Sequence, residues 1–242
     1  MKVLEPTALM RQAADVLDGV TSEVVVIGAV ALEVALAGRQ ARSAATLDVD
    51  GAVSIASAPA VIARLEEAGL KASKEPRERG FTWLREGLKI QLIRPPARVS
   101  RPPVSGLVAN TNVSLAEKYR ESVAFPERPE DPRLVVARPA AVLALKGHAF
   151  GRTGPKGGVV ERDYHDAFLL IAHVGEEIAA EYGATDDGQL RGLVRKAVTD
   201  LQLEPARQAL RNQVTRLEPD VSAREADLRL TRAVRSFSRR LA

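Results

Sequence analysis

The front half of the chain alternates short apolar runs with amphipathic stretches of helical period. Apolar residues at helical spacing predict a helix over residues 9–17, and a second helix over 29–37. The continuous apolar run at 24–28 predicts a short buried strand that ends in a glycine, and 48–55 predicts the next strand. Pro59 near the start and Gly69 just past the end favour a further helix that runs to Ala68.

The middle of the chain predicts more strands and one long connection. Residues 81–84 and 88–93 are separated by a short polar turn and predict a hairpin. Residues 94–112 carry several prolines and few large apolar side chains, which indicates a loop or an extended crossing segment. Residues 134–137 predict one more strand. These elements together predict a small mixed sheet flanked by helices.

The back half of the chain is helical in pattern. Residues 139–150 and 162–174 have helical spacing around a glycine-rich stretch, and the remaining residues continue as helices. We therefore expect an α+β protein with two domains. Residues 1–138 would form an α/β domain, and residues 139–242 a helical domain.

Composition narrows the class of protein without identifying it. The 242 residues are 45% hydrophobic and 27% charged, which is typical of a globular protein. No apolar run reaches the roughly 20 residues of a membrane helix, and the N-terminus lacks the apolar core of a signal peptide, so we expect a cytoplasmic protein. The absence of cysteine excludes disulfides, thiolate zinc sites and a cysteine nucleophile.

The formal net charge of +4 is a mild excess, but its distribution is uneven. Six arginines lie between positions 224 and 240, and Arg232, Arg235 and Arg239 share one face of the predicted helix. This face is either the solvated side of a terminal helix or a stripe that binds an RNA backbone. In both cases the predicted apolar side of the helix consists of Leu228, Val234, Phe237 and Leu241.

Asp48 and Asp50 are the first candidates for chemistry. Two carboxylates spaced two apart at the start of a strand project from the same face of the sheet, where they suit a divalent metal ion. The preceding strand ends at Gly28, and a helix follows. A glycine-ended strand, a helix and then a carboxylate pair suggest phosphoryl chemistry.

Two motifs carry a family resemblance. The first runs from Ile27 to Leu32, continues with Gly38, Arg39 and Arg42, and ends in Thr46-Leu47-Asp48-Val49-Asp50. It resembles the opening motif of the DNA polymerase β-like nucleotidyltransferases, in particular the abortive-infection branch. The second motif, about 100 residues later, resembles the second signature of that branch and consists of Leu145-Lys146-Gly147-His148-Ala149-Phe150, Arg152 and Arg162-Asp163-Tyr164-His165-Asp166-Ala167.

The resemblance implies roles for particular residues. Asp48 and Asp50 would bind Mg²⁺ or Mn²⁺, and Asp163 or Asp166 would orient Lys146 or assist the acceptor. The catalytic set would then be Asp48, Asp50, Lys146, Asp163 and Asp166. A glycine-rich loop at 151–158 would close over the phosphates of a nucleoside triphosphate. The residues implied for nucleotide binding are Gly28, Ala29, Arg39, Arg42, Thr46, Lys146, Arg152 and Arg162.

Two positions depart from the family pattern. Ala29 stands where many members have serine or a second glycine. Gln91 lies on the strand that often carries a third carboxylate, and a neutral amide cannot act as a general base. Trp83 is interpreted as a core residue and His173 as a structural one, whereas His148 and His165 are candidates for ribose or phosphate contacts.

Three functions are compatible with these observations. The first is a magnesium-dependent nucleotidyltransferase, similar to the toxin of a toxin–antitoxin pair, with RNA such as tRNA as acceptor and a cognate antitoxin protein as partner. The second transfers the nucleotide to a protein or to a small molecule such as an antibiotic. The third, suggested by Gln91, is a catalytically silent binding module with the same fold.

Overall fold

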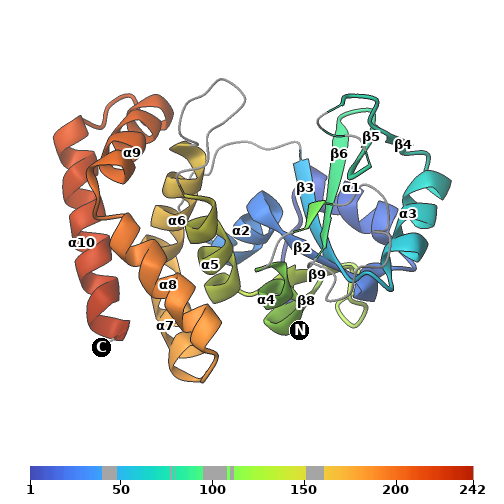
Figure 1. Cartoon of the computed structure of the whole chain (residues 1–242), viewed down its shortest axis with the longest axis horizontal. Coiled ribbons are helices and arrows are strands. Elements are labelled where there is room, and N and C mark those ends of the chain that lie inside the picture. Colours follow the sequence, from blue (N-terminus) through green and yellow to red (C-terminus); the bar gives the residue numbers. More distant parts are fainter. Residues whose placement is uncertain are drawn as a thin grey trace. The chain divides into compact units, whose positions relative to one another are not determined.

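The computed structural model describes residues 1–39, 48–76, 78, 80–94, 108–109, 112–150 and 161–241. The chain divides into two compact units (Figure 1). The sheet unit consists of Met1–Ala37 and Thr46–Arg138, and the helical unit of Gly38–Ala45 and Pro139–Ala242. None of the described helices is both long and apolar enough to cross a membrane.

One mixed sheet organises the sheet unit, so the predicted α+β class is confirmed. In the described residues its strand order is β1-β8-β9-β2-β3-β6-β5-β4, and β7 pairs with β6. Central β3 is antiparallel to β2 and parallel to β6. The strands are β1 (Lys2–Val3), β2 (Val24–Ile27), β3 (Asp48–Val53), β4 (Lys71–Ala72), β5 (Thr82–Arg85), β6 (Leu88–Arg94), β7 (Val108–Ala109), β8 (Arg120–Ala124) and β9 (Leu134–Ala137).

A capping side chain, a proline and a glycine mark where helices of the sheet unit begin and end. The Thr7 side chain accepts a hydrogen bond from the Met10 amide at 3.2 Å and caps the first helix, and Gly19 follows that helix with a φ of 83°. Pro59 lies in the first turn of α3, where its missing N–H costs nothing. The helices are α1 (Ala8–Leu17), α2 (Gly28–Leu36), α3 (Ala58–Glu67) and α4 (Val113–Lys118), with a 3₁₀ turn at Thr21–Glu23.

The sheet is larger than the sequence predicts. The hairpin of β5 and β6 and the strands β2, β3 and β9 agree with the predictions. The prediction omitted β1 and β8, which pair in parallel, and the short helix α4. Strand β1 has only two residues, and β8 begins with the polar residues Arg120-Glu121-Ser122, so neither shows the periodicity of a strand.

The helical unit contains α5 (Pro139–Ala149), α6 (Glu161–His173), α7 (Gly175–Gly183), α8 (Gly188–Asp200), α9 (Glu204–Leu217) and α10 (Ala223–Leu241). Helix α5 packs on α6 and α8, and α6 packs on α9 and α10. A Cβ on Gly147 would lie 2.4 Å from the Cβ of Ala197, so the glycine allows α5 to approach α8 closely. Gly175 in turn lies under the ring of Phe237.

The apolar face of α10 differs from the predicted one. Leu228 is 41% exposed, whereas Leu230 is 3% exposed and contributes to the core. The buried positions have the spacing of one helix face, and Leu228 lies about 200° around the helix axis from Leu230. The prediction of Leu228 as a core residue is therefore wrong. The buried residues of α10 are Ala226, Leu230, Val234 and Phe237.

Candidate functional site

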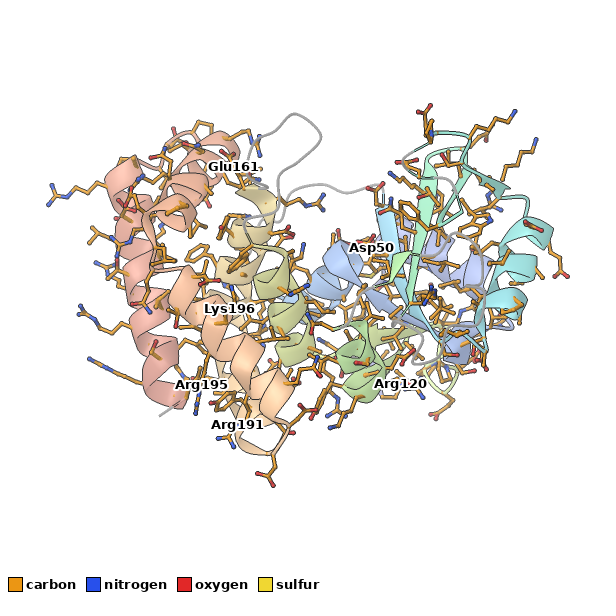
Figure 2. The ribbon with its side chains drawn as sticks, viewed as in Figure 1. Asp50, Arg120, Glu161, Arg191, Arg195 and Lys196 are labelled. Atoms are coloured by element: carbon orange, nitrogen blue, oxygen red, sulfur yellow. The ribbon has the colours of Figure 1, made fainter. Side chains whose placement is uncertain are left out.

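The carboxylate pair lies at the beginning of β3 in the sheet unit. Asp48 and Asp50 are half-buried, and Val49 between them is buried. Because neighbouring residues of a strand face opposite sides of the sheet, the two carboxylates share a face. Asp50, labelled in Figure 2, is opposite Ile27 of β2 and Gln91 of β6 in the strand register. The pair is thus held between two neighbouring strands.

Gly28 leaves the space in which the Asp50 carboxylate lies. It follows β2, opens α2 and has a φ of 65°, a value that favours glycine. A Cβ at this position would lie 2.2 Å from Asp50 Oδ2. The carboxylate therefore occupies the space that any other side chain would fill, directly beside the N-terminus of α2. The amide dipoles at that end of a helix favour negative charge.

A Gly28→Ala variant should show how much this contact matters. Gly19 also has positive φ, but nothing lies within 4 Å of its Cβ position. Gly19→Ala should therefore cost only the backbone strain of roughly 1–2 kcal/mol, and Gly28→Ala should cost more because Asp50 must also move. Urea denaturation of both variants measures the difference. Equal costs would mean that the Asp50 carboxylate is not held against Gly28.

Gln91 lies beside the pair on β6. It is in register with Asp50, so the two side chains share a sheet face. Its amide Nε2 donates to Thr82 Oγ1 of β5 at 3.3 Å. The amide oxygen of Gln91, its only acceptor, is not used in this hydrogen bond. The neutral residue noted in the sequence thus stands next to Asp50.

Lys89 belongs to this region, although the sequence analysis gave it no role. It is in register with Asp48, and its Nζ lies 2.6 Å from Glu78 Oε1. Burial opposes the charged form, but the hydrogen bond to Glu78 and the charges of Asp48, Glu78 and Asp50 raise the pKa of Lys89. Strand β6 alternates buried and half-buried residues, and this alternation places Lys89 and Gln91 on the same face. The alternation of apolar and polar residues along 88–93 was the sequence signal that could have identified Lys89.

A cavity of about 370 Å³ opens beside Asp48. Its wall is the β5–β6 hairpin, with residues 84–89, so Lys89 lines it as well. The cavity thus combines one carboxylate of the pair with a lysine. Pockets of this size are common for small ligands.

The second group of predicted residues gathers in the helical unit. Lys146 of α5 lies between two aspartates of α6, with its Nζ 2.9 Å from Asp163 Oδ1 and 2.7 Å from Asp166 Oδ2. Arg162 Nε lies 3.9 Å from the same Asp166 oxygen. The helix spacing of Asp163 and Asp166 places both on one face. The motif therefore builds an ion-pair cluster that joins α5 to α6.

This cluster is largely buried. The side chains of Lys146 and Asp166 are 13% and 1% exposed. Burial by itself would lower the pKa of Lys146, but the charges and hydrogen bonds of Asp166 and Asp163 outweigh it and raise that pKa. Asp166 Oδ1 is buried without a hydrogen bond from any described residue.

The predicted residues outside the carboxylate pair and the Lys146 cluster differ in burial and in their contacts. Ala29 is buried in the first turn of α2, and Trp83 is buried in the sheet unit. Arg39 forms an ion pair with Glu177 of α7. His165 is 2% exposed, and burial lowers its pKa, so it lies inside the helical unit. Three predicted nucleotide-binding residues, Arg42, Thr46 and Arg152, lie outside the described residues. The glycine-rich loop at 151–158 lies outside them as well.

The predicted arginine stripe on α10 is exposed. Arg232, Arg235 and Arg239 all have exposed side chains. Two other arginines of the helix are engaged in ion pairs: Arg229 with Glu218 at 3.0 Å, and Arg240 with Glu176 at 2.9 Å. Exposure is compatible with both interpretations of the stripe.

Comparison of the chain with protein-family models, with curated proteins and with solved structures gives no match. The resemblance to the nucleotidyltransferases therefore rests on the two motifs of the sequence.

Proposed function

We propose that the protein is a magnesium-dependent nucleotidyltransferase that transfers a nucleoside monophosphate from a triphosphate to RNA. The arrangement of Gly28, Asp50 and Asp48 supports this proposal most directly. It combines a carboxylate pair with the amide end of a helix, and phosphates are attracted to such helix ends. The nucleotidyltransferase fold and its family assignment are part of the proposal.

The donor atoms of this region suit Mg²⁺. Two carboxylates on one strand face are hard oxygen ligands, and Mg²⁺ in such sites takes its other ligands from substrate phosphates and water. Among the described residues no group of three or more His, Cys, Asp or Glu is placed to hold a metal ion. In the proposal, Asp48 and Asp50 would hold Mg²⁺ or Mn²⁺, and the triphosphate and water would supply the other ligands. The bound ion would neutralise charge that develops on the phosphate oxygens.

The other residues have supporting roles in the proposal. Gly28 and the start of α2 would bind phosphate through backbone amides. The ammonium group of Lys89 would provide a positive charge beside Asp48. Asp163 and Asp166 would hold the Lys146 ammonium in place, as their contacts at 2.9 and 2.7 Å favour. The exposed arginines of α10 would bind the RNA backbone. By resemblance, the RNA would be tRNA, and an antitoxin protein would be the partner.

Gln91 favours a second candidate, a nucleotide-binding module without catalysis. Its position beside Asp50 is where a third carboxylate would act as base, and an amide cannot accept the proton. The two candidates differ in a direct assay.

The test incubates the protein with Mg²⁺, each α-labelled nucleoside triphosphate in turn, and total RNA or cell lysate. The expected result is label in RNA, chiefly tRNA. Label found only in protein or in small molecules would mean that one of these, and not RNA, is the acceptor. Absence of label from every fraction, together with retained triphosphate binding, would favour the silent module.

A Gln91→Glu variant should tighten Mg²⁺ binding. A third carboxylate beside Asp50 adds a charged oxygen ligand, and we expect an increase in affinity of about tenfold, equivalent to ~1.4 kcal/mol. Isothermal titration calorimetry measures it. Gln12→Glu, an exposed position on α1 of the sheet unit, is the matched control for the added charge. Unchanged affinity in Gln91→Glu would mean that position 91 does not face the ion.

A further inference from the structure

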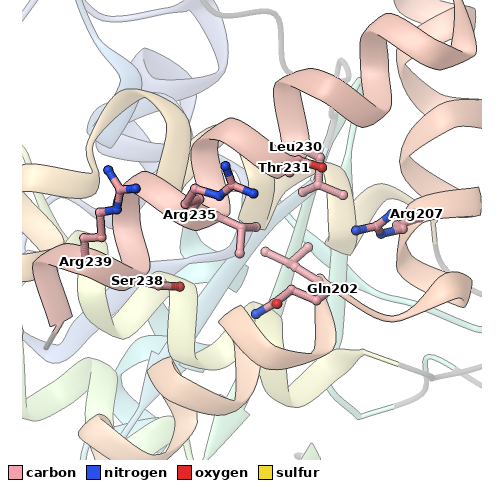
Figure 3. A pocket seen from close by; sticks show the side chains of 9 residues that line it. Gln202, Arg207, Leu230, Thr231, Arg235, Ser238 and Arg239 are labelled. Carbon is pink, nitrogen blue, oxygen red and sulfur yellow. The ribbon is translucent and has the colours of Figure 1, made fainter.

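A groove of about 530 Å³ lies within the helical unit, between α9, α10 and the turn that follows α8 (Figure 3). Arg207 of α9 lines one side, and Arg235 and Arg239 of α10 line the other. The floor is apolar and consists of the buried residues Leu201, Leu230 and Val234. The groove thus joins three guanidinium groups to an apolar surface.

Every charged residue that lines this groove is an arginine. Arg207 Nε is buried without a hydrogen-bond partner among the described residues. Within the same described part of the chain, Arg235 and Arg239 have no carboxylate within ion-pair distance. Burying a donor without a partner is costly, so the Arg207 guanidinium is suited to an acceptor that comes from outside the protein.

Three arginines of the same two helices that lie outside the groove are paired with carboxylates. Arg211 of α9 contacts Asp227 at 2.9 Å, and Arg229 and Arg240 of α10 each contact a glutamate. Part of the positive charge of α9 and α10 outside the groove is thus neutralised by carboxylates, whereas among the described residues no carboxylate pairs with the arginines that line it.

We infer that this groove binds a phosphate-bearing ligand with a flat apolar part, namely a nucleotide. Guanidinium groups form paired hydrogen bonds with phosphate and stack on aromatic rings. The side chains of Thr231, Ser238 and Gln202 offer further polar contacts at the rim, and the apolar floor suits a base. A free nucleoside monophosphate and a nucleotide within an RNA strand both supply this chemistry.

This inference deepens the RNA-binding part of the proposed function, with which it shares Arg235 and Arg239, but it does not depend on nucleotidyl transfer. The groove lies apart in sequence from Asp48 and Asp50 and contains no carboxylate that binds metal. A protein that transfers no nucleotide would still possess it. Measurements in EDTA separate the two proposals, since the carboxylate pair needs a metal ion to hold phosphate.

The test is calorimetric titration of the full-length protein in EDTA with UMP, AMP, inorganic phosphate and a short single-stranded RNA that lacks a 5′ phosphate. The test variant is Arg207→Gln with Arg235→Gln. The matched control is Arg195→Gln with Arg224→Gln, two exposed arginines outside the groove. Circular dichroism confirms that both variants are folded.

We expect the test variant to lose affinity by about tenfold per arginine, because each substitution removes charged hydrogen-bond donors to phosphate. The control should bind as the wild type does. Binding of UMP or AMP supports a free nucleotide as ligand, and binding of the RNA alone supports a strand. An equal loss in the control, phosphate binding as tight as that of UMP, or no binding of either nucleotide or RNA would overturn the inference.

Discussion

Replacing Asp48 with alanine is expected to lower nucleotidyl transfer at least about a thousandfold while leaving the protein folded. A metal ion contributes several kcal/mol to the stabilisation of such a transition state, and ~4 kcal/mol corresponds to about a thousandfold in rate. Asp48 is half-buried at the first position of β3, so its removal leaves the buried faces of the sheet intact. Label transferred per minute at saturating Mg²⁺ and triphosphate measures the loss.

Glu86→Ala is the matched control, because Glu86 is an exposed carboxylate that lines the same cavity as Asp48. It should retain wild-type transfer. Thermal unfolding of both variants should stay close to that of the wild type. Transfer by Asp48→Ala at the wild-type rate would remove Asp48 from the proposed metal site. A loss of transfer in Glu86→Ala would instead indicate a general effect of charge near the hairpin.

Replacing Lys146 with methionine is expected to destabilise the protein by about 3–5 kcal/mol, the usual cost of breaking a buried ion pair. The variant leaves Asp163 and Asp166 without their cation, and the Asp166 side chain is only 1% exposed. The pKa of Lys146 is raised, so its contribution is fully present below its ordinary pKa of 10.5 and is lost as the pH rises through the higher folded value. Urea denaturation at neutral pH measures the loss.

Lys196→Met is the control, because Lys196 forms an exposed pair with Asp200 one turn away on α8. Such a pair contributes about 0.3–0.5 kcal/mol. A triple variant with Lys146→Met, Asp163→Asn and Asp166→Asn should recover much of the lost stability, because no buried charge is left alone. A cost below about 1 kcal/mol for Lys146→Met would contradict a strong buried cluster.

Much of the fold was predictable because several elements have strong local patterns. The apolar run of β2 and the helical period of α1 mark their elements without help from the rest of the chain. Alternation along β3 was likewise sufficient to place Asp48 and Asp50 on one face. The edge of the sheet was not predictable in this way. Strand β8 begins with polar residues, and only its pairing with β9 and β1 makes it a strand.

The surroundings of the candidate residues were less predictable than their positions. Lys89 lies beside Asp48 because β3 and β6 pair in parallel. These two strands are separated in the chain by α3, β4 and β5. The predicted apolar side of the last helix included Leu228 and not Leu230. Only the packing of α10 on α6, α7 and α9 shows that Leu230 is the buried residue.

Local sequence was sufficient for the class of fold, for the strand that carries Asp48 and Asp50, and for the helices that carry Lys146, Asp163 and Asp166. Tertiary structure alone decided what each carboxylate touches. It placed the Asp50 carboxylate in the space left by Gly28, put Gln91 beside it, and enclosed Lys146 between two aspartates. The physical reason is that strand register and helix packing are set by contacts between distant segments, whereas periodicity reports only which face of an element is buried.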